Sequence, residues 1–111
     1  MLHEMNLWHN SFEKIEERTK TIEMRLNDEK RSRIKTDDTI EFINIDNGKK
    51  LKCLVKNIFK YQNFKELYQY HNKILLGYEE DDEENPFDML EYYSKDDIER
   101  YGVVGIEVRV I

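Results

Sequence analysis

The densest group of chemically useful side chains begins at Lys20 and continues through Glu23 and Arg25. On a β-strand, Glu23 and Arg25 lie on one face, roughly 6.5–7 Å apart along the chain. Long side chains at that spacing can pair with each other or bind one ligand together. Lys20, at the entrance of the strand, can turn toward both, and it can lose its charge to repulsion by the arginine or keep it through attraction by the glutamate. The residues thus predict either a polar ligand site or a ladder of ion pairs on an exposed strand.

A basic stretch follows this group. Lys30, Arg31, Arg33 and Lys35 could neutralise phosphates, and residues 1–60 carry a net charge of +2. Residues 61–111 carry −8, with an unbroken acidic run at residues 79–84 that reads as a solvated loop. The overall charge of −6 opposes the wrapping of a long nucleic acid. A short RNA, a hairpin or a nucleotide suits the charge distribution better.

Several common chemistries lack their sequence signatures. The chain has no Gly-x-Ser-x-Gly elbow and no phosphate-binding Gly-Lys-Ser/Thr loop. Its single cysteine, Cys53, has no partner for a disulfide, and the three histidines show no ligand spacing, so we expect neither metal nor cofactor. No apolar run of membrane-spanning length and no signal peptide are present, so we expect a cytoplasmic protein without membrane association.

The aromatic residues allow two interpretations. Trp8 could pack against the core as a staple for the helix that follows, or it could line the ligand site. Tyr92 and Tyr93 stand at helical spacings from Met89, which favours packing in the core over stacking on a base.

Alternating apolar and polar residues predict five strands. They are 2–7, 20–26, 39–45, 49–60 and 103–111. Asp46-Asn47-Gly48 predicts a hairpin loop between the third and fourth, with Gly48 in the left-handed conformation. In the fourth strand, Cys53, Val55 and Phe59 should face the core and the alternate lysines should face solvent. The last strand should close the sheet.

Short helices are predicted between the strands. Capping signals at Asn10, Asn63, Asn85 and Ser94 start helices that run to about Arg18, His71, Tyr93 and Tyr101. The residues 73–77 give no clear pattern. This order of elements predicts one α+β domain over residues 1–111, a small mixed or antiparallel β-barrel with short flanking helices.

The spacing of Lys20, Glu23 and Arg25 after a short helix resembles the ASCH domain family. The likeness continues through Asp38-Thr39-Ile40-Glu41-Phe42 and the final Tyr101-Gly102-Val103-Val104-Gly105-Ile106-Glu107, and so spans nearly the whole chain. The family is similar in fold to the PUA domain. Its usual Gly-x-Lys-x-x-Glu-x-Arg motif has Arg18 here in place of the glycine, and a later Gly-Asp pair is here Asp37-Asp38. A glycine would permit a positive φ that arginine disfavours.

The resemblance implies a role around RNA or modified nucleosides, and it leaves three functions open. The first is a binding domain in which Lys20, Glu23, Arg25 and Trp8 hold a base while the basic stretch contacts phosphates. The second follows family members similar to small bacterial amidohydrolases, which deacetylate N4-acetylcytidine with a lysine, a threonine three residues later and a distant glutamate. Lys20 then matches the lysine, Glu23 occupies the threonine position and could act as a base, and Arg25 matches an arginine. The third is a ribonuclease using Lys20 and Glu23 for proton transfer.

Overall fold

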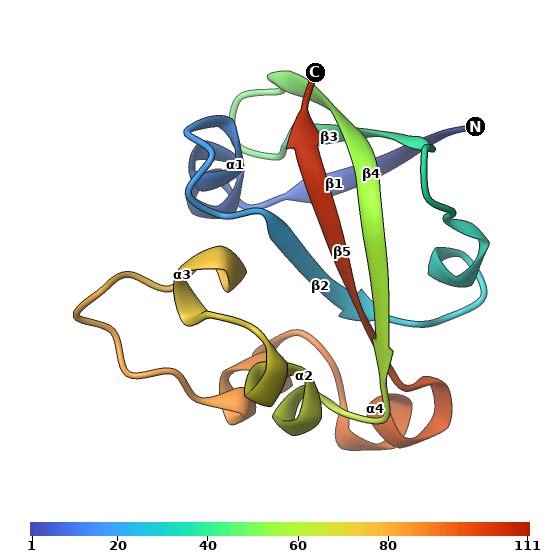
Figure 1. Ribbon diagram of the computed structural model, residues 1–111, viewed down its shortest axis with the longest axis vertical. Helices are drawn as coiled ribbons and strands as arrows, with labels where there is room; N and C mark the ends of the chain where they lie inside the picture. The colour runs from blue at the N-terminus through green and yellow to red at the C-terminus, as the bar shows by residue number, and fades with distance from the viewer.

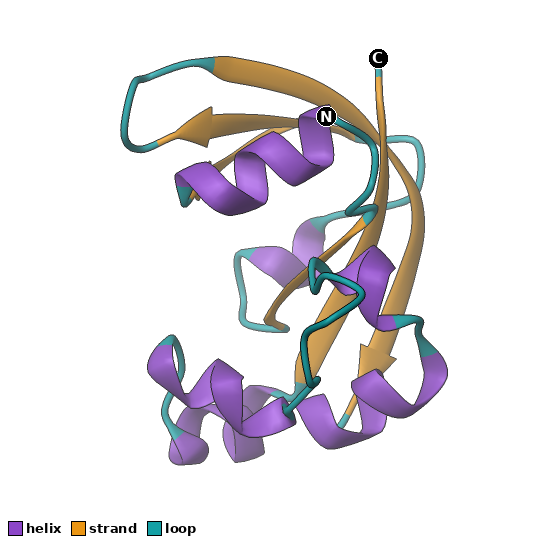
Figure 2. Cartoon of the chain, turned by 90° about the vertical axis from the view of Figure 1, so that its left-hand side faces the viewer, coloured by secondary structure: helices purple, strands orange, loops and turns teal.

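The computed structural model describes residues 1–111 and contains one five-stranded mixed sheet (Figure 1). Its strands are β1 (Leu2–Leu7), β2 (Ile22–Leu26), β3 (Thr39–Asn44), β4 (Lys50–Tyr61) and β5 (Val103–Val110). They lie in the order β1-β3-β4-β5-β2, in which only β1 and β3 are parallel. The sheet is strongly curled (Figure 2), so the predicted α+β fold of PUA type is confirmed.

The two edge strands of the curled sheet are β1 and β2. The prediction that the last strand closes the sheet is wrong, because β5 lies between β4 and β2 and pairs with both. Val103, Val104, Gly105 and Ile106 are all buried, so this part of β5 is covered on both faces, as an interior strand must be. The open seam of the barrel therefore runs between β1 and β2.

Short helices cover the two ends of the sheet. They are α1 (His9–Glu16), α2 (Phe64–Tyr70), α3 (Lys73–Leu76) and α4 (Lys95–Tyr101), together with the 3₁₀ helices η1 (Arg31–Arg33) and η2 (Pro86–Glu91). Helix α1 lies near β1 and β3, α2 and α4 lie toward the opposite end, and α3 lies between them, with Lys14 of α1 donating to Gly77 O at its end (Figure 1). None of these helices has the length and apolar character needed to cross a membrane.

The predicted caps hold in three of four cases. The side chains of Asn63, Asn85 and Ser94 accept backbone N–H groups at the starts of α2, η2 and α4. Asn10 does not cap α1, which begins earlier with Trp8 as its first flanking residue. The chain passes from β1, which ends at the buried Leu7, into α1 at His9, so Asn10 already lies within the first turn of the helix.

Two buried clusters form the core. One lies around Phe12, Ile40 and Phe42 near α1, and the other lies around Leu67 and Ile22 beneath the C-terminal helices. Such a division follows from the curl, which turns different parts of one sheet toward different helices.

A β-bulge changes the facing of residues within β4. Cys53 and Val55 are completely buried, as predicted. Between Val55 and Asn57 the pairing with β5 shifts by one residue, which reverses the alternation. Ile58 consequently packs against the first cluster, and Phe59, predicted to do so, instead contacts the His71 ring at a centroid distance of 4.7 Å.

Two residues other than glycine adopt a left-handed backbone conformation. Arg18 has φ 71° and Asp37 has φ 75°. These are the two positions at which the motifs of the resemblance have glycine. The local backbone thus keeps the conformation that glycine favours, at a conformational cost for the residues present here. Gly48 has φ 76°, as the hairpin prediction required.

Candidate functional site

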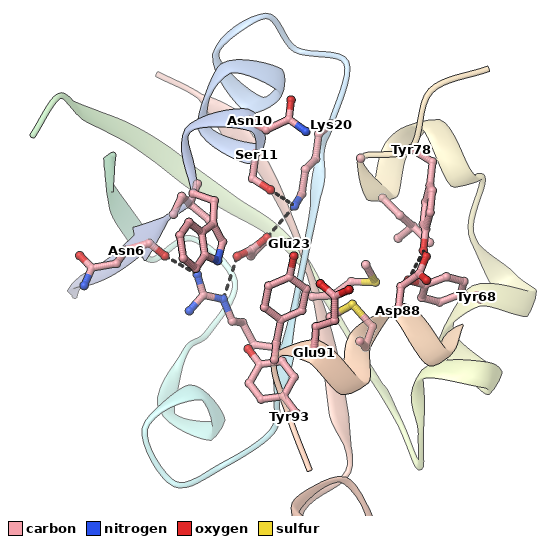
Figure 3. Close-up of a pocket in the computed structure, with 18 of the residues that line it drawn as sticks. Asn6, Asn10, Ser11, Lys20, Glu23, Tyr68, Tyr78, Asp88, Glu91 and Tyr93 are labelled. Carbon is pink, nitrogen blue, oxygen red and sulfur yellow. Dashed lines mark hydrogen bonds and ion pairs between the residues drawn. The ribbon is translucent and has the colours of Figure 1, made fainter. Parts of the chain in front are cut away.

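A cavity of about 610 Å³ opens at the seam between β1 and β2 (Figure 3). Its lining comes from both halves of the chain. The end of β1, the start of α1 and β2 form one wall, and residues of α2, α3 and η2 form the other. A cavity of this size suits a small organic ligand.

Three charged side chains meet at the first wall. The Glu23 carboxylate accepts from Lys20 Nζ at 2.8 Å and from Arg25 Nε at 2.7 Å (Figure 3). Lys20 and Glu23 are only 6% and 5% exposed, so they do not lie on an exposed ion-pair ladder. Burial alone would raise the pKa of Glu23, but the attraction of Lys20 and Arg25 prevails and lowers it to about 2. Glu23 is therefore a carboxylate at neutral pH and a weak base.

Arg25 also joins the two edges of the sheet. Its Nη2 donates to the backbone oxygen of Asn6 at 2.7 Å, so a side chain on β2 bonds to β1 where no backbone pairing exists. Burial disfavours the guanidinium charge, yet the Glu23 carboxylate outweighs this effect and raises the pKa of Arg25. The guanidinium of Arg25 thus bridges the seam at one point and also borders the cavity.

The position of Lys20 depends on close packing against Gly77. Gly77 ends α3 with φ 109°, and a Cβ atom there would lie 3.0 Å from Cδ of Lys20. Thr21 donates its N–H to Leu75 O at 3.0 Å, which holds the entrance of β2 against α3. The lysine stem is thus confined between the strand and this turn.

Ser11 is a polar neighbour that the sequence did not single out. It lies on α1, and Lys20 Nζ donates to its Oγ at 3.3 Å. Its position in the sequence gives no sign of this contact, because the packing of α1 across the sheet brings it to the lysine. The wall formed by Lys20, Glu23, Arg25, Ser11 and Asn6 is called the ionic wall below.

The opposite wall is built from tyrosines and carboxylates. Tyr78 Oη lies 2.9 Å from Tyr68 Oη and donates to Asp88 Oδ2 at 2.8 Å (Figure 3). Burial raises the pKa of Tyr78, and its bond to Asp88 acts in the same direction. Glu91 and Tyr93 complete the group, which is called the tyrosine wall below.

Aromatic rings at the cavity differ in their exposure. Trp8 and Tyr92 line it and are 60% and 54% exposed, so neither is buried in the core. Tyr93 is half-buried and stacks on Phe64 with ring centroids 6.0 Å apart. The core packing predicted for both tyrosines is therefore correct for Tyr93 and wrong for Tyr92, which directly follows η2 and keeps its ring outside the core.

The predicted basic stretch divides into residues near the seam and residues away from it. Lys30 and Arg31 line a second cavity of about 360 Å³. Arg33 pairs with Glu29 at 3.0 Å on the surface, and neither it nor Lys35 borders either cavity. The structure thus brings Lys30 and Arg31, but not the whole stretch, next to Arg25.

The cavity offers hydrogen-bond donors and acceptors rather than metal ligands. No three histidine, cysteine or carboxylate side chains gather where they could share a metal ion. No histidine lines either cavity: His3 bonds to Asp38, His9 pairs with Glu13, and His71 bonds to Tyr61.

Comparison with known proteins gives one family and similar solved structures. The family model of the ASCH domain matches residues 5–111. The crystal structure of hypothetical protein PH0355 is similar at 34% identity with a TM-score of 0.85, with all of both chains covered. The solution NMR structure of protein PF0455 from Pyrococcus furiosus is similar at 35% identity with a TM-score of 0.78, covering 100% of this chain and 98% of that one. No curated protein matches.

Proposed function

This chain belongs to the ASCH domain family, and from that premise we propose that it binds RNA or a modified nucleoside, with the base held in the cavity at the seam. The observation that carries the proposal is the buried cluster of Lys20, Glu23 and Arg25 facing a cavity of about 610 Å³. Charged groups are costly to bury unless they are paired. Here they are paired and still border open space, which favours a recognition role.

The ionic wall supplies donors for the edge of a base. Lys20 uses Nζ for Glu23 and Ser11, and Arg25 uses Nε and Nη2, so each retains N–H groups for a ligand. The tyrosine wall offers carboxylate oxygens of Asp88 and Glu91 as acceptors. A nucleobase carries acceptors and donors on its edge and matches such a pair of walls.

The exposed rings of Trp8 and Tyr92 supply the stacking surface. Proteins that bind single-stranded RNA stack bases on aromatic side chains, which tolerate any base because each has a π-face. Since both rings are more than half exposed in the free protein, a ligand that covers them gains apolar contact.

Trp8 provides the readout for a test, because it is the only tryptophan in the chain. We expect its fluorescence to change saturably on titration with ribonucleosides or a six-nucleotide RNA. Tyr92→Ala should weaken binding about tenfold, since stacking on an aromatic ring contributes about 1–3 kcal/mol per base. Phe87→Ala is the control, because Phe87 is 74% exposed and outside the cavity. No saturable change, or equal losses in both variants, would contradict the proposal.

Deacylation of an N4-acylated cytidine is the second candidate, and Ser11 is the observation that favours it. The resemblance calls for a hydroxyl near the lysine, and Glu23 occupies the position of the threonine. Ser11 Oγ, 3.3 Å from Lys20 Nζ, supplies a hydroxyl from another element. Against turnover, Lys20 donates to Glu23, and an ammonium has no lone pair for attack.

Mass spectrometry of a panel of N4-acylated cytidines separates the two candidates. Release of cytidine by the unmodified chain, lost in Lys20→Ala and in Ser11→Ala, would establish the enzyme. Binding without release would leave the binding function. The ribonuclease hypothesis has no observation in its favour, because no histidine lines either cavity.

A further inference from the structure

A smaller cavity adjoins the main one along the seam. It has a volume of about 360 Å³ and shares Asn6, Arg25 and Arg31 with the larger cavity. Lys30 and Glu4 line the smaller cavity but not the larger one. The two cavities therefore form adjacent parts of one groove, with Arg25 and Arg31 bordering both.

One of the three cations that line the smaller cavity has no ion pair. Arg25 is committed to Glu23 and the Asn6 carbonyl, and Arg31 Nη1 is bonded to Asp28 at 3.0 Å. Arg31 Nε is buried and has no hydrogen-bond partner. Lys30 is exposed and forms no ion pair. Lys30 is therefore the one cation lining this cavity that is not already paired with a carboxylate.

The two cavities of the groove differ in the carboxylates that line them. Glu4 is the only acidic residue that lines the smaller cavity. Asp88 and Glu91 line the far wall of the larger one. A phosphate is repelled at the tyrosine wall and attracted beside Lys30, so the charges define one preferred orientation for a phosphorylated ligand.

We propose that the smaller cavity is a phosphate subsite formed by Lys30, Arg31 and Arg25. The inference rests on the proposed function, because it places the base of the ligand in the larger cavity and its phosphate in the smaller one. The preferred ligand is then a nucleotide, either a free monophosphate or a residue within an RNA strand, over the corresponding unphosphorylated nucleoside. Lys30 supplies the unpaired charge, and the two arginines fix the direction of approach.

Two variants test this assignment, one that removes the positive charge of Lys30 and one that removes the negative charge of Glu4. We would titrate the chain with each ribonucleoside, its 3′- and 5′-monophosphates, and inorganic phosphate, using Trp8 fluorescence and amide chemical shifts. A monophosphate should bind about fivefold tighter than its nucleoside, as expected for one partly exposed ion pair. Lys30→Gln should abolish this preference, and Glu4→Gln should increase it about twofold. Lys52→Gln is the matched control, since Lys52 is an exposed lysine of β4 outside both cavities.

The outcomes distinguish the inference from the function on which it rests. Equal binding of nucleosides and monophosphates, unchanged in Lys30→Gln, would overturn the subsite and leave the base-binding function intact. Binding of inorganic phosphate without any preference for nucleotides would also overturn it. If neither nucleosides, nucleotides nor a six-nucleotide RNA bind, both proposals fail. When RNA is the ligand, Lys30→Gln should reduce the slope of log affinity against log salt concentration by about 0.7. If the true ligand is a free nucleotide, it should bind tighter than the RNA strand.

Discussion

The two walls of the cavity present polar groups in opposite ways. In the ionic wall, Glu23 is buried and each charged group is bonded to another, and Arg25 also holds the sheet edges together. In the tyrosine wall, Asp88 and Glu91 are exposed and belong to a 3₁₀ helix that covers the cavity from outside. The charged groups of the first wall are built into the fold, whereas the carboxylates of the second lie at its surface, although Tyr68 behind them belongs to the core. Substitutions in the two walls should therefore differ in their cost to stability.

The largest expected effect comes from Glu23→Gln. The change leaves Lys20 and Arg25 as buried cations without a counter-charge, and breaking a buried ion pair costs about 3–5 kcal/mol. We expect a loss of that size in the free energy of unfolding, measured by urea denaturation. Glu13→Gln is the control, because the Glu13 side chain is half-exposed on α1 and an exposed pair contributes about 0–1 kcal/mol. A loss below about 1 kcal/mol for Glu23→Gln would remove the distinction between the walls.

Acid should act on the ionic wall through the same residue. The pKa of Glu23 is about 2 in the folded chain against an ordinary value of 4.5, so between these values the unfolded chain binds a proton that the folded chain does not. Stability is therefore fully present above about pH 4.5 and falls on acidification toward pH 2, by on the order of a few kcal/mol. Urea midpoints measured from pH 2.5 to 7 should fall less steeply in Glu23→Gln than in the unmodified chain.

A remaining acid dependence is expected in that variant. The bond from His3 to the Asp38 carboxylate lowers the pKa of Asp38 from its ordinary value of 3.8 to about 2. The stabilisation that this bond gives is therefore fully present above about pH 3.8 and is lost as the pH falls toward 2. Parallel pH profiles for the two chains would mean that Glu23 is not the residue that makes the ionic wall acid-sensitive.

A smaller effect is expected in the tyrosine wall. Tyr78→Phe removes the hydroxyl that joins Tyr68 to Asp88, and a lost hydrogen bond of this kind costs about 1–2 kcal/mol. Tyr92→Phe, which changes an exposed ring, should stay within about 0.5 kcal/mol of the unmodified chain. Thermal denaturation measures both. A loss for Tyr78→Phe as large as that for Glu23→Gln would make the tyrosine wall as integral to the fold as the ionic wall.

The smallest predicted effect is a gain in stability from Arg18→Gly. Arg18 leads into the ionic wall with φ 71°, and a left-handed residue other than glycine costs about 1–2 kcal/mol. Part of this is offset by the greater freedom of glycine when unfolded, so Arg18→Gly should stabilise the chain by about 0.5–1 kcal/mol. Arg18→Ala keeps the strain and should not stabilise it. Asp37→Gly should gain less, because aspartate tolerates this conformation better. Chemical denaturation that shows a loss for Arg18→Gly would refute this account.

The sequence predicts the ionic wall better than the tyrosine wall, and the reason is distance along the chain. Glu23 and Arg25 lie within one short strand and Lys20 lies just before it, so period-two alternation places Glu23 and Arg25 on one face. Tyr68, Tyr78 and Asp88 are ten residues apart in turn, and only the folding of α2, α3 and η2 brings their polar atoms together. No local sequence pattern indicates that these residues come into contact.

Burial of the ionic cluster also lay beyond the sequence. Alternation indicates which residues share a face, but it does not show whether another element covers that face. Here α1 and the turn at Gly77 cover Lys20. The bulge in β4 could not be predicted either, because it depends on how β5 pairs with β4 and not on the residues of β4 alone.

Chemical labelling of Cys53 can report how often the middle of the sheet opens. Cys53 is the only thiol in the chain, is 0% exposed on β4 between β3 and β5, and burial raises its pKa to about 11. A thiol reagent at neutral pH can reach it only when these strands separate. The labelling rate therefore times the opening of the sheet, in the unmodified chain and in each variant described above, without any added probe.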